Sequence, residues 1–324
     1  MPKGLGLAAA AGLTSALVTL SVISGGGLGV VLAYVAPLPL VLVGLAFGFI
    51  PCLAAQAVGA LVLAVANWTA VPAFLAIGAI PAMLLVSVAL RGRRIDGKME
   101  WGKPGPMLII LSLGAIAVMT LVTLSLPTEG KGAAIWLREQ AAPLIDAALP
   151  GAPDEVKSAI VGLWAAILPA MVGVAWLAMT LANGLFGQWA VARAGRALRP
   201  TPDYTDLHLP WWLVLTAVLA AGAGTIGVEI AGQAGTGDAG YLVRNAAILL
   251  MAPYLVSGLV EVHVALRGKP LARLWLAVFY GVFFALFGWA AIAVTVWGVV
   301  RQWMRSRREE PAPDQEREDG SHSA

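Results

Sequence analysis

The sequence predicts an all-α fold, a polytopic transmembrane helical bundle of about nine spans (eight to nine), and three observations carry this prediction. Of the 324 residues, 59% are hydrophobic and only 12% are charged, whereas soluble domains carry roughly 25% charged residues. The mean hydropathy is +0.83, and a soluble domain cannot bury so much apolar surface because its core stops growing near ~250–300 residues. The apolar residues also form runs of about 20, the length of helix that crosses a bilayer core.

The first five spans are expected before residue 127. The first apolar run is followed by more apolar chain, so we interpret it as a retained span and not as a signal peptide. A glycine triplet, residues 25–27, separates it from the second span. The expected spans are Leu5–Ser24, Leu28–Phe49, Pro51–Trp68, Pro72–Leu90 and Met107–Leu126.

A short basic loop gives the clearest sign of orientation. Arg91, Arg93, Arg94, Lys98 and Lys103 follow the fourth span, and short loops rich in Lys and Arg stay on the cytoplasmic side. Residues 127–157, after the fifth span, are mildly acidic, so we expect an external segment there. Its middle, residues 133–149, places apolar residues among charges, which is typical of an amphipathic helix lying on the membrane surface.

The last apolar stretch conflicts with the orientation of the others. Three spans, at about Ser158–Phe186, Pro210–Ile230 and Tyr241–Leu266, keep every basic loop on one side, but both ends of Leu274–Val300 are basic. About 27 residues make a helix of ~40 Å, too short for two full spans. We therefore favour one long tilted span, while Gly288 near its middle leaves a bend or a re-entrant arrangement open.

We predict one transmembrane helical domain over residues 1–304 and a polar tail over residues 305–324. The tail mixes charges with proline and holds few apolar residues, a composition typical of disorder. Helical spans joined by short basic loops indicate a multi-pass protein of a bacterial inner membrane.

Polar residues inside the spans define a candidate binding cavity. A charged side chain at the bilayer centre costs about 2.5–3.5 kcal/mol on insertion scales, so those that occur are usually functional. Spans one to six hold none at depth, which argues against an ion-coupled carrier, a pump or a metal transporter. The candidates are Tyr254, Ser257, Glu261, Asn183, Asn245 and Gln56.

Each candidate also has a structural interpretation. Tyr254, Ser257 and Glu261 share one helical face, which favours a polar stripe along a cavity, but Glu261 at the membrane interface would also balance Arg267 or Arg273. The neutral amides more commonly form hydrogen bonds between helices, each worth about 0.6 kcal/mol.

A stripe of small residues, Ala8, Gly12 and Ala16, runs along the first span. Small residues at this spacing let a second helix approach closely. The second helix would be either a neighbouring span of the same chain or a separate membrane subunit.

No cofactor, metal site or catalytic residue is expected. Cys52 is the sole cysteine, and the three histidines, His208, His263 and His322, are scattered, so neither thiolates nor imidazoles form a ligand cluster. The sequence has no phosphate-binding loop, nucleophile elbow or paired deep carboxylates, which argues against an enzyme. The positive charge lies in short loops, so we expect membrane lipids and no nucleic acid as partners.

Four short stretches carry a family resemblance: Ala36-Pro37-Leu38-Pro39-Leu40, Asn183 through Arg199 to Trp212, Asn245 through Pro253 to His263, and Trp297-Gly298-Val299. Together they resemble the YybS-like bacterial membrane-protein family, a domain of unknown function. The family has an acidic residue shortly after the last glycine, where this chain has Arg301. The resemblance implies an N-terminal half similar to the substrate-binding subunits of energy-coupling-factor transporters, in which small residues of the first span dock a membrane coupling subunit. The matching positions are Ala8, Gly12 and Ala16.

Two functions follow as hypotheses. The kinked spans, the small-residue stripe and the resemblance favour a small-solute-binding or transport component that a partner energises. The amphipathic external segment, the basic loops and the charged tail favour a non-enzymatic scaffold for cell-envelope or division machinery. A cavity between the spans is expected for the first and tight packing for the second.

Overall fold

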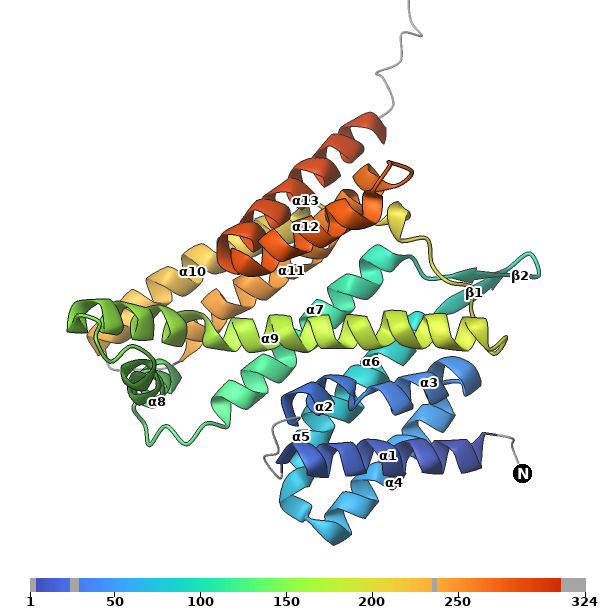
Figure 1. Ribbon diagram of the computed structural model, residues 1–324, viewed down its shortest axis with the longest axis horizontal. Coiled ribbons are helices and arrows are strands. Elements are labelled where there is room, and N and C mark those ends of the chain that lie inside the picture. Colours follow the sequence, from blue (N-terminus) through green and yellow to red (C-terminus); the bar gives the residue numbers. More distant parts are fainter. Residues whose placement is uncertain (1–3, 24–28, 235–237, 310–324) are drawn as a thin grey trace, which may run out of the picture.

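The computed structural model describes residues 4–23, 29–234 and 238–309, and in these the chain is a helical bundle. Seven helices of the described chain are long and apolar enough to cross a membrane. Figure 1 shows the long helix α9 lying between an N-terminal group, α1–α6, and a C-terminal group, α10–α13. The all-α transmembrane bundle predicted from the sequence is confirmed.

The N-terminal group is held together by close helix contacts. It comprises α1 (Leu5–Ile23), α2 (Gly29–Val35), α3 (Leu38–Phe47) and α4 (Phe49–Ala66). A Cβ on Gly12 of α1 would lie 2.1 Å from the Ala55 carbonyl oxygen of α4, so the two backbones touch. The expected second span is two shorter helices, because α2 ends just before Pro37.

The next span is irregular. It runs through a 3₁₀ turn η1 (Trp68–Ala70), α5 (Val71–Phe74), a π-helical turn η2 (Leu75–Ala79) and α6 (Ile80–Ala89). The basic loop after it folds as an antiparallel hairpin of β1 (Gly92–Ile95) and β2 (Lys98–Trp101). Asp96 and Gly97 between the strands have φ of 48° and 76°, the left-handed pair that a two-residue type I′ turn requires.

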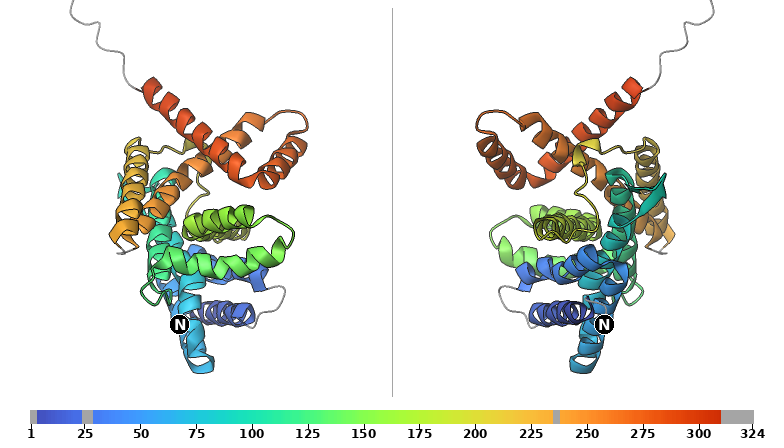
Figure 2. Two further views of the ribbon diagram at one scale, coloured as in Figure 1. Left: turned by 90° about the vertical axis from the view of Figure 1, so that its left-hand side faces the viewer. Right: turned by 90° about the vertical axis from the view of Figure 1, so that its right-hand side faces the viewer.

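The middle of the chain forms α7 (Pro104–Leu124), α8 (Ala133–Ala148) and α9 (Asp154–Arg193). The predicted amphipathic helix is present as α8, which exposes Ile135 and Leu144. Figures 1 and 2 together show α8 crossing beside one end of α9 at a steep angle. The two elements are tied by an ion pair of 3.3 Å between Lys157 and Asp146.

The C-terminal group begins with the 3₁₀ turn η3 (Tyr204–Asp206) in the segment that follows α9. It continues with α10 (Trp212–Ala234), α11 (Ala239–Leu266), α12 (Ala272–Ala285) and α13 (Phe287–Glu309). Residues 305–309 were expected in a disordered tail and instead complete α13; the rest of that tail, residues 310–324, lies outside the described residues.

The last apolar stretch is a helical hairpin, so the expectation of one long span was wrong and the bend was right. The break falls at Leu286, between α12 and α13, and α12 at 14 residues is only about 21 Å long. α13 then returns to the end of α11, where Arg305 pairs with Glu261. Both basic ends of the stretch therefore lie at one end of the bundle, which removes the conflict in orientation.

Two glycines permit α13 to cross α11. A Cβ on Gly258 would lie 2.1 Å from the Val294 carbonyl oxygen, and one on Gly298 would lie 2.1 Å from the Tyr254 carbonyl oxygen. Backbones this close leave room for no side chain, as at other small-residue crossings of membrane helices. The crossing fixes where the polar end of α13 meets α11.

Where proline removes a backbone hydrogen bond from α9, side chains of α11 supply a replacement. Pro169 has no N–H, which leaves the Ala165 carbonyl of α9 without its helical donor. The Tyr241 hydroxyl of α11 donates to that oxygen. One turn further along α11, Asn245 accepts from the Ala170 N–H at 3.0 Å and donates to the Ala166 oxygen at 3.1 Å.

The orientation of the hairpin can be tested by labelling. In a Cys52→Ala background, single cysteines at Lys98, Ser306 and Gly151 report on the β-hairpin, the end of α13 and the α8–α9 turn. We expect an impermeant maleimide to label the first two from one face of membrane vesicles and the third from the other. Labelling of the Ser306 position from the Gly151 face would contradict the re-entrant hairpin.

Candidate functional site

A cavity of about 380 Å³ lies between the helices at the end of the bundle that carries the basic loops. Its volume falls in the range of small-molecule sites, ~300–1,000 Å³. Its walls come from α6, α7, α9 and α11, with the 199–207 segment covering one end. The residues that form most of the apolar wall are Leu85, Ala89, Met107, Leu108, Leu111, Leu181, Leu185, Leu207, Val256 and Val260.

Close packing of neighbouring helices shapes this wall. A Cβ on Gly184 of α9 would lie 2.8 Å from a methyl carbon of Leu85 on α6, so the two helices meet at the cavity margin. On the other side, Gly173 of α9 lies against Leu249 of α11, where an added Cβ would come within 2.7 Å. The cavity therefore lies beside the contacts that hold α9 in place.

Arg199 is the charged residue buried at the cavity wall. It is 5% exposed, and its Nη1 donates to the Ala89 oxygen at 2.7 Å while Nη2 donates to the Gly102 oxygen at 3.3 Å. The Trp101 ring lies 5.6 Å from its Cζ. Its Nε has no hydrogen-bond partner, and among the described side chains no carboxylate forms an ion pair with it.

Burial lowers the pKa of the Arg199 guanidinium, and the neighbouring Tyr204 partly offsets this effect. The same surroundings raise the pKa of the Tyr204 phenol through burial, and Arg199 opposes that change. Arginine remains protonated in proteins at neutral pH. The cavity wall therefore carries a fixed positive charge.

The rest of the polar lining lies at the same end. Gln188, Tyr204, Thr205, His263 and Arg267 border the cavity, and its described lining includes no Asp or Glu. Gln188 donates to the Arg199 carbonyl oxygen at 3.0 Å, and the His263 ring lies 5.9 Å from the ring of Tyr280 on α12. The cavity is thus apolar along its length and cationic at one end.

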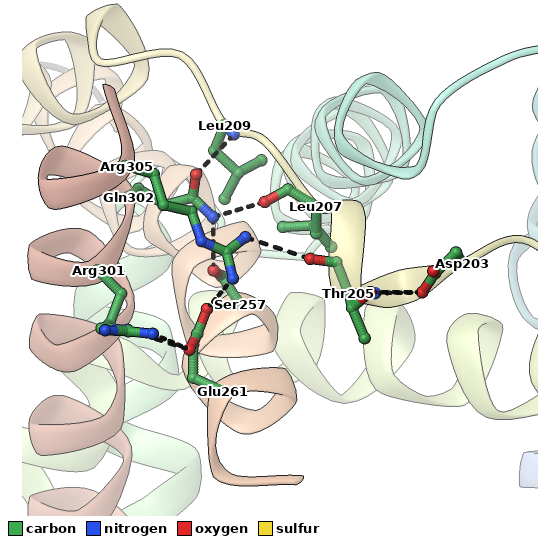
Figure 3. Close-up of polar contacts among 9 residues, drawn as sticks. All are labelled: Asp203, Thr205, Leu207, Leu209, Ser257, Glu261, Arg301, Gln302 and Arg305. Carbon is green, nitrogen blue, oxygen red and sulfur yellow. Dashed lines mark hydrogen bonds and ion pairs between the residues drawn. The ribbon is translucent and has the colours of Figure 1, made fainter. Parts of the chain in front are cut away.

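The segment that covers this end is clamped by α13. Figure 3 shows the Gln302 amide between this segment and α11. Its oxygen accepts from the Leu209 N–H at 3.1 Å, and its nitrogen donates to the Leu207 oxygen at 2.7 Å and to the Ser257 hydroxyl at 2.9 Å. The Tyr254 hydroxyl donates to the Pro210 oxygen at 2.8 Å.

Beside the clamp lies a charged cluster, also visible in Figure 3. The Glu261 carboxylate, 5% exposed, pairs with Arg301 at 3.0 Å and with Arg305. Arg305 donates in turn to the Thr205 oxygen at 3.2 Å. One carboxylate thus holds two guanidinium groups of α13, and one of these reaches the cavity-covering segment.

The structure brings together three of the six candidate residues. Tyr254, Ser257 and Glu261 share a face of α11, as their spacing predicts, but this face meets α13 and does not line the 380 Å³ cavity. Tyr254 borders a separate groove between α10 and α13. The expected balancing partners of Glu261, Arg267 and Arg273, are replaced by Arg301 and Arg305.

The three amide candidates lie elsewhere and serve as hydrogen bonds between or within helices. Asn183 of α9 donates to the Tyr34 oxygen of α2 at 2.7 Å. Asn245 joins α11 to α9 beside Pro169, and Gln56 donates to the Cys52 sulfur one turn before it at 3.3 Å. None of the three lines the cavity.

The small-residue stripe is covered within the chain. Ala8 and Ala16 are 1% and 0% exposed, and α4 lies directly on Gly12. Of the two alternatives that the sequence left open, packing against a neighbouring span accounts for the stripe.

The residues that line the cavity or hold its covering segment differ in how visible they are in the sequence. Arg199 follows α9 among other arginines, and nothing in its spacing separates it from the exposed Arg196. Gln302 had a usable signal, because it is a neutral amide on a helical face with Arg305. The basic residues after residue 300 offered a further signal, because their charge is opposite to that of Glu261, but Glu261 was expected to balance Arg267 or Arg273 instead.

Comparison with known proteins adds no relative: no family model matches the chain, and neither a curated protein nor a solved structure matches it significantly.

Neutralising Glu261 should weaken the attachment of α13. Glu261→Gln leaves Arg301 and Arg305 without their carboxylate, and we expect a loss of about 1–3 kcal/mol of stability. Thermal unfolding in detergent measures it, with Glu229→Gln, an exposed carboxylate on α10, as the control. Equal melting temperatures for both variants would show that the cluster contributes nothing.

The α1–α4 contact can be tested with a single methyl group. Gly12→Ala places a Cβ against the Ala55 carbonyl, and we expect the overpacking to cost about 1–3 kcal/mol. Gly6→Ala on the same helix is the control, because nothing lies within 4 Å of its added Cβ. Thermal unfolding of the purified protein in detergent measures the difference. If Gly12→Ala were as stable as wild type, α4 would not be packed against the small residues of α1.

Proposed function

We propose that this protein is a membrane-embedded component that binds or transports a small solute. The observation that carries the proposal is the 380 Å³ cavity between α6, α7, α9 and α11. Binding sites of membrane bundles are built from side chains on facing helices, and interrupted helices often border them. Here η2, in the α6 span, contains such an interruption.

The lining indicates an apolar solute. Leucine, valine, alanine and methionine form most of the wall, and polar groups are confined to one end. The spans hold no proton-relay chain of acids among the described residues, which favours passive binding or an external source of energy. An energising partner would dock elsewhere than on Ala8, Gly12 and Ala16, since α4 covers them. We also propose a bacterial inner membrane as its location, and the helical spans joined by short basic loops support this proposal.

A scaffold for cell-envelope or division machinery is the second candidate. The observation that favours it is α8, which presents Ile135 and Leu144, 51% and 70% exposed, beside one end of the bundle. A membrane surface would cover these residues equally well, so the cavity supports the first proposal more specifically.

Filling the cavity should abolish solute retention. Val260→Phe enlarges a side chain in the cavity wall, whereas Ile248→Phe makes a similar change at a lipid-exposed position of the same helix. We expect wild type and Ile248→Phe, extracted directly into nanodiscs, to carry a tightly bound small molecule that Val260→Phe lacks. Native mass spectrometry measures it, and an empty wild-type protein would count against solute binding.

A further inference from the structure

We propose that the cavity selects a single-chain anionic amphiphile, with its acidic head group at Arg199 and Arg267 and its hydrocarbon chain along the leucine-lined wall. This inference rests on the proposed function, because it names the class of solute for the same cavity.

The shape of the cavity fits one extended chain. Along α11 its lining runs from Val256 to Arg267, the residue that follows the helix, a rise of about 16 Å. The deeper part is lined by Leu111 and Leu181, and the shallow part by the cationic residues. At about 380 Å³ the cavity is near the lower limit for ligand sites, which suits one chain better than the body of a two-chain lipid.

The charge of the cavity fits an anion. Two guanidinium groups and one imidazole, from Arg199, Arg267 and His263, border it, and its described lining contributes no carboxylate. Arg199 is 5% exposed and its Nε lacks a partner. A buried cation without a paired anion is unfavourable, and an acidic head group would supply the missing charge.

The position of the charges fits an amphiphile in a bilayer. The cationic end of the cavity lies beside the basic β-hairpin, because Arg199 donates a hydrogen bond to the Gly102 oxygen just after β2. Arg305 reaches the segment that covers this end. Basic loops next to membrane spans attract the anionic head groups of the membrane surface, and the chain of such an amphiphile would point from there along the apolar wall.

The experiment uses the full chain in phosphatidylcholine nanodiscs and three probes. Dodecyl phosphate carries both chain and charge, dodecanol carries the chain alone, and inorganic phosphate carries the charge alone. Binding is counted by native mass spectrometry and corrected with protein-free nanodiscs. We expect dodecyl phosphate to bind about tenfold more tightly than dodecanol, as one charge-assisted hydrogen-bonded contact would give, and inorganic phosphate not to bind.

Variants separate the head-group site from general folding. Arg267→Gln, at an exposed position, should reduce the preference for dodecyl phosphate without changing dodecanol binding. Lys269→Gln in the same loop should change neither. Because Arg199 also holds two backbone carbonyls, Arg199→Gln is compared with Arg199→Lys, which keeps the charge, and with Arg196→Gln, a neutralised exposed neighbour. We expect Arg199→Gln alone of these three to lose the preference.

The outcomes distinguish the two proposals. If neither dodecyl compound binds, or if both bind Val260→Phe as well as wild type, the single-chain amphiphile is wrong; the solute-binding function fails only if wild-type protein also carries no small molecule that Val260→Phe lacks. If dodecanol binds as tightly as dodecyl phosphate, the cavity binds a solute but the anionic class is wrong. Binding of inorganic phosphate alone would show a simple anion site and would also overturn the amphiphile.

Discussion

In the hydrocarbon core of a bilayer, a backbone carbonyl that loses its helical donor finds a new one only within the protein. This constraint acts where proline interrupts the spans. At Pro169, Tyr241 and Asn245 reach from α11 to the backbone groups of α9. At the π-helical turn, the Ala76 oxygen, whose π-helical partner would be the missing N–H of Pro81, accepts from the Trp176 indole of α9 at 2.7 Å. Each repair fixes the axial position of one helix against another.

These repairs determine where the cavity can form. α9 is held to η2 by Trp176 and to α11 by Asn245, so the residues further along α9 toward its C-terminus, Leu181 to Gln188, face α7 and α11 at a set depth. The other end of α11 is fixed by the glycine crossing with α13. From there Gln302 and Arg305 bind the backbone of the 205–209 segment. The segment that covers the cavity thus depends on a hairpin that contributes no residue to the cavity wall.

Hydropathy was sufficient to predict seven of the nine expected spans, because membrane burial is a property of whole segments. The second and the last expected spans are each two shorter helices. The break at Leu286 was harder, since the charge pattern called for a turn but no strong breaker marks the position. The β-hairpin had a signal in Asp96-Gly97, the dipeptide favoured in two-residue turns. The hairpin was not predicted from it, because this loop was interpreted only through its Lys and Arg residues.

The functional residues were less predictable than the fold, because a polar side chain in a span can either join two helices or face a cavity. The sequence made Asn183 and Asn245 candidates for a cavity. In the structure, the side-chain amide of each forms hydrogen bonds with backbone groups of a neighbouring helix. Glu261 was expected to balance Arg267 or Arg273 close by, but its partners, Arg301 and Arg305, are about 40 residues away on a helix that returns to the end of α11. Only the tertiary arrangement separates a polar group that joins helices from one that faces a cavity.

Arg199 illustrates this separation. A purely structural role would explain two of its hydrogen bonds. Nη1 donates to Ala89 at the end of α6 and Nη2 donates to Gly102 after β2, so Arg199 attaches the segment after α9 to both elements. A neutral donor would form such contacts without removing a charge from water, which is the costly part of burying arginine. These hydrogen bonds therefore do not account for the positive charge at an otherwise apolar wall. An anion at the cavity end of Arg199 would account for the charge, because it would compensate the buried guanidinium.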